Sequence, residues 1–140
     1  MARILVVDDD PDIRLLLRLE LSAEGHTIVE TGDGQAALAE LQRAPADLVL
    51  LDIMMPVLDG WGVLRSLDPS APPVVVVTAL ATHDNQHLEE MLDLGAVDVV
   101  VKPFDPGWLV DLVDQVCSLD EAGRAAHRAA RLSDARRKAP

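Results

Sequence analysis

The sequence predicts an α/β domain built on an open, doubly wound parallel sheet. Short aliphatic runs of strand length recur along the 140 residues, and segments with helical periodicity lie between them. The strong runs are continuous rather than alternating, as in parallel strands that helices cover on both faces. Regular alternation of strand and helix is typical of such sheets, whose crossover connections are right-handed.

Five strands are expected. The four strong ones are ILVV at 4–7, LVLL at 48–51, VVVV at 74–77 and VVV at 99–101. The fifth, HTIVET at 26–31, alternates between polar and apolar residues, so we expect it at an edge of the sheet.

Five helices are expected as well. Apolar residues recur at helical spacing over residues 11–24, 34–43, 60–67 and 84–94, and again after Asp105. Asp105 is a good N-cap, and Pro106 suits the first helical position. Residues 1–119 form the expected domain. We expect the Ala- and Arg-rich segment 120–140 to be a partly helical or disordered tail that extends the last helix by a turn or two.

The acidic charge is unevenly spread along the chain. The formal net charge is −12, and residues 1–119 hold 21 of the 24 Asp and Glu but only 6 of the 12 Lys and Arg. An acidic body argues against nucleic-acid binding by this domain. It favours cationic ligands, including metal ions.

Cysteine content and hydropathy indicate the compartment. Cys117 is the only cysteine, so no internal disulfide can form and a reducing compartment is expected. No apolar run approaches the ~20 residues of a membrane span. Acids follow the N-terminus too soon for a signal peptide. We therefore expect a cytoplasmic protein with no membrane contact.

Each strong strand is expected to end at a polar residue. In chain order, these residues are Asp8, Asp9 and Asp10, then Asp52, then Thr78, then Lys102. Parallel strands of such a sheet place their C-terminal ends along one edge, where ligands bind at the switch point in strand order. Four separate segments should therefore bring carboxylates, a hydroxyl and an ammonium group to one edge.

These residue types suit phosphoryl transfer. Carboxylates held close together repel one another, which raises their pKa values, and a divalent cation relieves that repulsion. Oxygen-only ligands suit Mg²⁺. A carboxylate can accept a phosphoryl group as an aspartyl phosphate. The charges of Mg²⁺ and Lys102, with the hydroxyl of Thr78, would neutralise and position that group.

The motifs that carry these residues resemble the response-regulator receiver domain of two-component signalling. They are ILVVDDDPDIR, DLVLLDIMMPVLDGW, VVVVTALA and VVVKPFDP, and the resemblance covers residues 1 to about 119. It implies a flavodoxin-like fold, with a doubly wound five-stranded parallel sheet in the order 2-1-3-4-5 and five helices in three α/β/α layers.

The resemblance also implies roles at the phosphoryl site. Asp52 matches the phospho-accepting aspartate, and Thr78 matches the hydroxyl that meets the phosphoryl group. Lys102 matches the lysine that pairs with a phosphoryl oxygen, and it precedes Pro103, which in the family often follows a cis peptide bond.

A metal site beside Asp52 is implied in the same way. Asp8 and Asp9 match the acidic pair that holds Mg²⁺ (or Mn²⁺), with Asp9 the direct ligand and Asp8 acting largely through water. Asp52 and the main-chain carbonyl of Met54 match the other protein ligands.

The implied phosphoryl donor is a phosphohistidine on a histidine kinase or phosphotransfer protein. The chain would then be a signalling phosphoacceptor rather than an enzyme. It would report through the face formed by the fourth helix, fifth strand and fifth helix, and a homodimer through that face is an option. The output partner is open, as is the choice between a stand-alone regulator and part of a longer one.

Two other functions are alternatives to this one. An aspartate-nucleophile phosphatase would need a second acid two residues after Asp52, where this chain has Met54. A pseudo-receiver or relay module would interact without phosphorylation-dependent output, and the intact Asp9, Asp52 and Lys102 argue against it.

Three positions depart from the family pattern. Val99 stands where an aromatic switch residue is usual, so we expect Thr78 and the loop 79–84 to carry the signal. Met54 and Leu80 stand where polar residues can position the hydrolytic water, so we expect a long-lived phosphoryl group.

The remaining candidates are expected to be structural. We expect His26 and His127 on the surface and Cys117 as a packed or half-buried thiol. His83 and His87 stand four apart on an expected helix, but no third metal ligand is evident.

Overall fold

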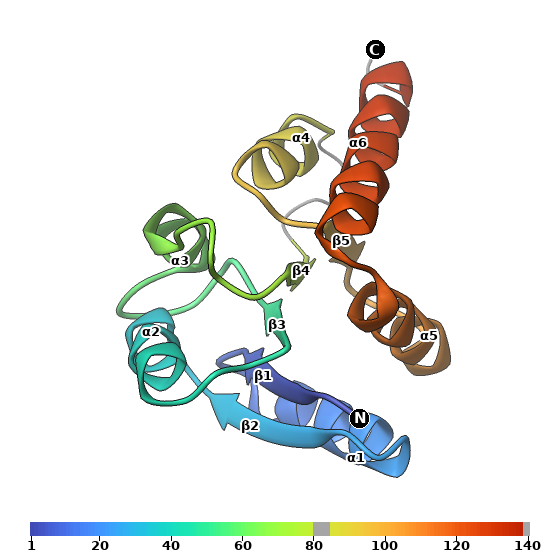
Figure 1. Cartoon of the computed structure of the whole chain (residues 1–140). Helices are drawn as coiled ribbons and strands as arrows, with labels where there is room; N and C mark the ends of the chain where they lie inside the picture. Colours follow the sequence, from blue (N-terminus) through green and yellow to red (C-terminus); the bar gives the residue numbers. More distant parts are fainter. Residues whose placement is uncertain (80–84, 139–140) are drawn as a thin grey trace.

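The computed structural model describes residues 1–79 and 85–138 as a single sheet with helices on both sides (Figure 1). The strands are β1 (Arg3–Val7), β2 (Thr27–Thr31), β3 (Leu48–Leu51), β4 (Val74–Thr78) and β5 (Asp98–Val101). The helices are α1 (Pro11–Ala23), α2 (Gly34–Arg43), α3 (Gly60–Ser66), α4 (Asn85–Asp93), α5 (Pro106–Ser118) and α6 (Glu121–Lys138).

All strand pairs are parallel, and the strand order is β2-β1-β3-β4-β5. This confirms the doubly wound fold and its predicted order. As expected, β2 is an edge strand and is only half-buried, whereas β1, β3 and β4 are almost fully buried. Continuous aliphatic runs therefore mark the strands that are covered on both faces.

Two apolar clusters, one on each face of the sheet, hold the helices in place. Alternate strand residues such as Ile4 and Val6 pack with α1 and α5, whereas Leu5 and Val7 pack with α2, α3 and α4. This arrangement gives three layers. Cys117 packs half-buried against the first cluster, as predicted, and burial raises the pKa of its thiol.

Several loop acids have a structural role at helix N-termini. The carboxylates of Asp10, Asp33, Asp59 and Asp105 each accept a hydrogen bond from a main-chain N–H in the first turn of α1, α2, α3 and α5. Such caps satisfy main-chain donors that have no partner within the helix, and they match the helix dipole. Acids of this kind are therefore explained without a ligand.

The described chain has six helices, so the prediction of five was wrong. Leu119 is extended and ends α5, and Asp120 starts a new helix by accepting a hydrogen bond from Gly123 N at 2.7 Å. The segment after residue 119 thus does not prolong α5. Instead, α6 runs along α4 and β5 (Figure 1). The domain boundary at residue 119 stays a prediction.

The side chains of two histidines expected on the surface are instead largely buried, and each contacts a carboxylate, so that prediction was wrong. The His26 side chain is 7% exposed, accepts a hydrogen bond from Ala2 N at 3.0 Å and lies 2.8 Å from Asp114 Oδ1. His127 Nε2 lies 2.8 Å from Asp98 Oδ2. Both partners are distant in sequence, which is why local patterns did not reveal them.

None of the helices in residues 1–79 and 85–138 combines the length and apolar character that a bilayer crossing requires.

Gly60 allows the close approach of α3 to the segment that follows β3. A Cβ at this position would overlap the main-chain oxygen of Asp52 and would lie 2.6 Å from Ile53 Cα. Gly60 N also donates to Ile53 O at 2.8 Å. The tight contact fixes the backbone directly after Asp52.

We predict that Gly60→Ala destabilises the fold by about 1–3 kcal/mol, because main chain rather than a flexible side chain blocks the added methyl group. The melting temperature should fall by roughly 3–10 °C in thermal unfolding. Gly107→Ala is the control, since its Cβ would meet nothing closer than 3.7 Å. Equal melting temperatures for Gly60→Ala and wild type would contradict this account.

Candidate functional site

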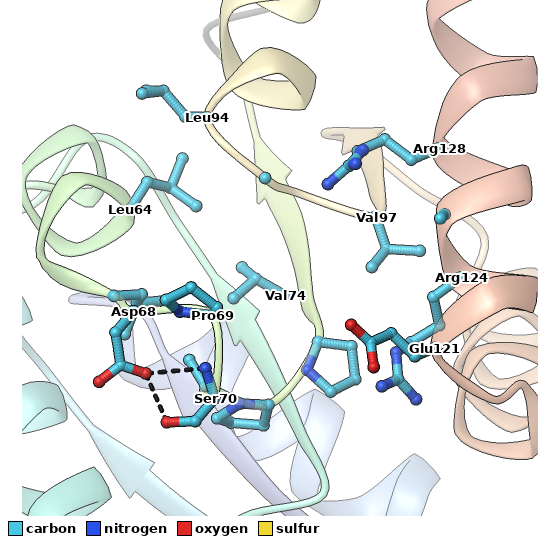
Figure 2. A pocket seen from close by; sticks show the side chains of 16 residues that line it. Leu64, Asp68, Pro69, Ser70, Val74, Leu94, Val97, Glu121, Arg124 and Arg128 are labelled. Carbon is cyan, nitrogen blue, oxygen red and sulfur yellow. Dashed lines mark hydrogen bonds between the residues drawn. The ribbon is translucent and has the colours of Figure 1, made fainter.

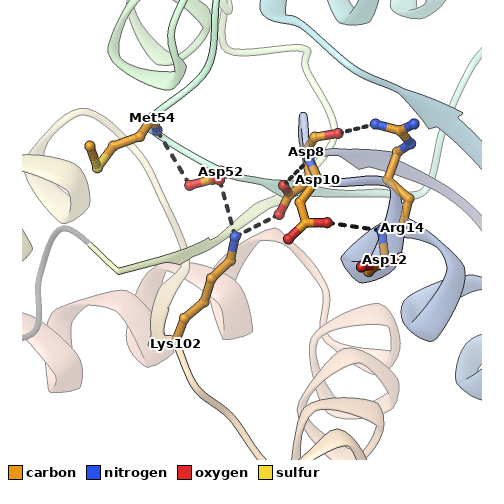
Figure 3. A network of polar contacts seen from close by, with 7 residues as sticks. All are labelled: Asp8, Asp10, Asp12, Arg14, Asp52, Met54 and Lys102. Carbon is orange, nitrogen blue, oxygen red and sulfur yellow. Dashed lines mark hydrogen bonds and ion pairs between the residues drawn. The ribbon is translucent and has the colours of Figure 1, made fainter.

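Four neighbouring strands bring polar residues to one edge of the sheet. Asp8 follows β1, Asp52 follows β3, Thr78 ends β4, and Lys102 follows β5. Lys102 Nζ lies 2.8 Å from Asp8 Oδ2 and 3.1 Å from Asp52 Oδ2 (Figure 3). The predicted convergence of carboxylates and an amine is therefore observed.

Asp9 joins the two paired acids in a cluster of three carboxylates. Asp8, Asp9 and Asp52 each place one oxygen within 4.8 Å of the others. Asp8 and Asp52 are only 3% and 6% exposed, whereas Asp9 is exposed to solvent. With all four groups ionised, Lys102 balances one of three negative charges. The cluster therefore retains negative charge in a partly buried place.

Burial and hydrogen bonding shift the pKa values of Asp8 and Lys102. Burial raises the pKa of Asp8, while hydrogen bonds from Lys102 and from Asp10 N partly oppose the rise. Burial also works to lower the pKa of Lys102, but its bonds to Asp8 and Asp52 outweigh this and raise that pKa overall. Lys102 thus stays charged at neutral pH.

Main-chain contacts hold the two buried carboxylates in position. Asp8 Oδ1 accepts from Asp10 N at 2.9 Å, and Asp52 Oδ1 accepts from Met54 N at 3.3 Å. The amide of Asp52 donates to Val7 O at 2.9 Å, which ties the end of β3 to β1. The strand ends and the main chain directly after them therefore hold the two carboxylates.

Thr78 and Lys102 are linked through the main chain. Thr78 is fully buried, and its carbonyl oxygen accepts a hydrogen bond from Lys102 N at 3.0 Å. The peptide bond between Lys102 and Pro103 is cis, as predicted. The residues matched to the phosphoryl contacts thus lie side by side where β4 and β5 end.

The donor set fits Mg²⁺. All three acidic groups offer hard oxygen ligands, and the single amine leaves charge for a cation to balance. Beside them lies an open hollow of about 670 Å³, whose lining includes Asp9, Met54 and Trp61. The part expected of the Met54 carbonyl stays a prediction.

Arg14 supports the acidic turn, and the sequence analysis missed it. Its Nη1 donates to the main-chain oxygen of Asp8 at 2.7 Å (Figure 3), and its Nε lies 3.5 Å from Glu30 Oε1. Arg14 stands one turn after the Asp10 cap, so the helical spacing could have placed it near the turn. Its contact with Asp8 depends on side-chain geometry that spacing does not show.

The chain matches the family described as "Response regulator receiver domain" over residues 4–114. It belongs to that family. The match covers most of the chain and confirms the predicted resemblance. The matched range of the receiver domain ends before α6.

Known relatives are regulators of greater length. The receiver domain is 43% identical over 105 residues to the "Probable transcriptional regulator ycf27" of Porphyridium aerugineum, a match that covers 74% of this chain and 43% of that protein. It is 43% identical over 109 residues to the "DNA-binding response regulator MtrA" of Mycolicibacterium smegmatis, covering 77% of this chain and 47% of that protein. The chain spans less than half the length of these relatives.

A solved structure shows the same fold. The chemotaxis response regulator CheY4 of Vibrio cholerae superposes with a TM-score of 0.76 and 29% sequence identity, covering 83% of this chain and 98% of that one. The similarity extends over nearly the whole of the smaller protein.

Val99 and Met54, two of the positions that depart from the family pattern, have different surroundings. Val99 is buried in the cluster beneath α4, and Met54 is 61% exposed beside Asp52. Leu80, His83 and most of the loop 79–84 lie outside the described residues. His87 packs near Trp61, with 6.1 Å between the ring centroids.

We predict that Asp9→Asn weakens Mg²⁺ binding about tenfold or more, because it removes one charged ligand from an exposed position. Isothermal titration with Mg²⁺ measures the change. Asp10→Asn is the matched control, since Asp10 caps α1 and Asn caps equally well. Equal affinities for Asp9→Asn and Asp10→Asn would argue against the proposed ligand set.

Proposed function

We propose that this receiver domain accepts a phosphoryl group on Asp52 and signals by a change of conformation. The observation that carries the proposal is the position of Lys102 Nζ, within hydrogen-bonding distance of both Asp8 and Asp52, inside a cluster of three carboxylates. A pseudo-receiver, whose output does not depend on phosphorylation, would not need an amine and a cluster of acids around one carboxylate.

The phosphoryl donor would be a phosphohistidine of a histidine kinase or phosphotransfer protein. An ionised oxygen of Asp52 attacks phosphorus, the phosphorus–nitrogen bond breaks, and the imidazole leaves. This is a self-promoted transfer to a signalling protein rather than turnover of a substrate. The donor would approach from the side of the open hollow that Asp9 and Met54 line.

Charge neutralisation is the main contribution of the surrounding residues. Asp8, Asp9, Asp52 and the main-chain carbonyl of Met54 would hold Mg²⁺ (or Mn²⁺), which when bound supplies positive charge for the phosphoryl oxygens. Lys102 would exchange its carboxylate partners for a phosphoryl oxygen. The hydroxyl of Thr78 would donate to another.

Signalling would follow from these new contacts. A dianionic phosphoryl group draws Thr78 and Lys102 toward Asp52, so it favours any arrangement of β4 and β5 that improves those contacts. The face formed by α4, β5 and α5 contains one of these strands, β5, and would report the change. A homodimer through that face would have to include or displace α6, which lies on α4 and β5.

We predict that acetyl phosphate with Mg²⁺ adds one phosphoryl group to the chain, seen by intact mass spectrometry. Asp52→Asn should abolish the gain, because it removes the nucleophile. Asp59→Asn should phosphorylate normally, since Asp59 caps α3 and Asn can replace it there. A gain that persists in Asp52→Asn would reject Asp52 as the acceptor.

We also predict that the phosphoryl group is long-lived, because apolar Met54 cannot orient an attacking water. Met54→Asn should speed its loss about threefold or more, since an amide can hydrogen-bond that water. The decay of phosphorylated protein, followed by intact mass, measures the rate. Val57→Asn is the control, because Val57 is exposed and has a positive φ of 69° that Asn tolerates. Rapid decay that Met54→Asn leaves unchanged would contradict this account.

A further inference from the structure

α6 covers part of the face through which the proposed function would signal. It packs along α4 and against β5 (Figure 1). Leu132 packs against the apolar cluster that holds Met91, Leu92 and Val99, and Ala135 is buried. The segment expected to be a tail therefore contributes to the covering of the sheet.

A buried carboxylate anchors α6 to the start of β5. Asp98 is only 4% exposed, and its Oδ1 lies 2.6 Å from Arg131 Nε. Its Oδ2 lies 2.8 Å from His127 Nε2, and Arg131 Nη2 also donates to Val99 O at 3.4 Å. A buried charge needs such partners, so Asp98 favours the docked position of α6.

The attachment is confined to one part of α6. Its first turns border a hollow of about 600 Å³, which residues 67–73, Leu94, Gly95 and Val97 also line. The Glu121, Arg124 and Arg128 side chains lie along the rim of this hollow (Figure 2). The contacts that hold α6 therefore lie mainly at the anchor and at the later turns.

The composition of α4 and α6 favours a contact between them that can open. α4 carries three acids and no Lys or Arg, whereas α6 carries six Lys and Arg against two acids. Leu132 is the only large aliphatic residue of α6. Interfaces that rest on charge and small residues, rather than on a large apolar area, resemble those of transient associations.

The position of α6 couples it to the phosphoryl site. Residues 79–84 connect Thr78 to α4, and β5 leads directly into Lys102. If a phosphoryl group draws Thr78 and Lys102 toward Asp52, the ends of β4 and β5 move, and α4 shifts relative to β5. A helix that is tied to both α4 and Asp98 cannot keep both sets of contacts. Packed elements respond to such shifts by changing between discrete arrangements.

We propose that α6 is a releasable cover of the α4–β5 surface and that phosphorylation of Asp52 releases it. The inference rests on the proposed function, because it takes Asp52 as the acceptor. It adds that the unphosphorylated chain hides part of its own signalling face.

Amide hydrogen exchange of the full chain tests the release, with beryllofluoride and Mg²⁺ as the phosphoryl analogue. Exchange of amides 124–135 should become about tenfold faster or more on adding the analogue, because an undocked helix frays. Asp52→Asn should show no such change. This measurement uses the intact chain and does not depend on a variant that disturbs α6.

The results separate the two proposals. Altered exchange around Asp52 and Thr78, with α6 unchanged or slower, would overturn the release of α6 and leave the proposed function standing. No change in either region would count against both. Faster exchange in α6 that also occurs in Asp52→Asn would show an effect unrelated to Asp52 and would overturn the inference.

Thermodynamic linkage between release of α6 and binding of the analogue provides a second test. If the analogue favours the released state, loosening α6 must strengthen binding of the analogue. Arg131→Gln should therefore raise the affinity for beryllofluoride about threefold or more by isothermal titration. Arg128→Gln is the matched control, because it removes the same charge from α6 at a side chain that makes no hydrogen bond or ion pair within the described residues. Equal affinities for the folded variants would overturn the inference.

Discussion

The structure depends on one electrostatic constraint: three carboxylates lie close together at the edge of a parallel sheet, and a single amine pairs with two of them. Asp8 and Asp52 are nearly buried, and Lys102 is the cation that reaches both. The carboxylates cannot move apart, because the ends of β1 and β3 hold them through main-chain hydrogen bonds. Burial raises the pKa of Asp8, and one amine beside three carboxylates leaves negative charge, so the cluster favours a further cation. In the proposed function, that cation and Lys102 together would offset the charge of a phosphoryl group on Asp52.

The carboxylates of this acidic chain have two kinds of role. Their hydrogen-bond and ion-pair partners distinguish the two roles. Asp10, Asp33, Asp59 and Asp105 accept main-chain N–H groups at helix starts, and such contacts complete a helix without any ligand. Asp8, Asp9 and Asp52 lie close to one another, and Asp8 and Asp52 also pair with Lys102. Adjacent residues can therefore differ in role, as Asp9 and Asp10 do. Composition shows that acids are abundant, but only their neighbours show which ones form a site.

Much of the fold and the site could be predicted because both depend on short-range patterns. Continuous aliphatic runs mark the buried strands, and the residue after each run reaches the edge where Asp52 and Lys102 meet. The rest depends on contacts between distant segments. His127 and Arg131 were missed because their partner, Asp98, lies about 30 residues away on β5. Arg14 was missed because periodicity describes which face of a helix is apolar, not where a long polar side chain ends.

The sequence did contain one signal for the contact between β5 and α6, and that signal is Asp98. Like Asp52, it is an acid next to an uninterrupted aliphatic run, and a carboxylate there requires a partner. For Asp52 that partner is Lys102 from the end of β5, and for Asp98 the partners come from α6. β5 therefore carries ion pairs at both ends, one in the candidate site and one beneath α6. Since a strand hydrogen-bonded to β4 along its length moves as a unit, a change in the partner of Lys102 acts on the same strand that holds the Asp98 anchor. This shared strand is the physical reason to treat the site and α6 as one system.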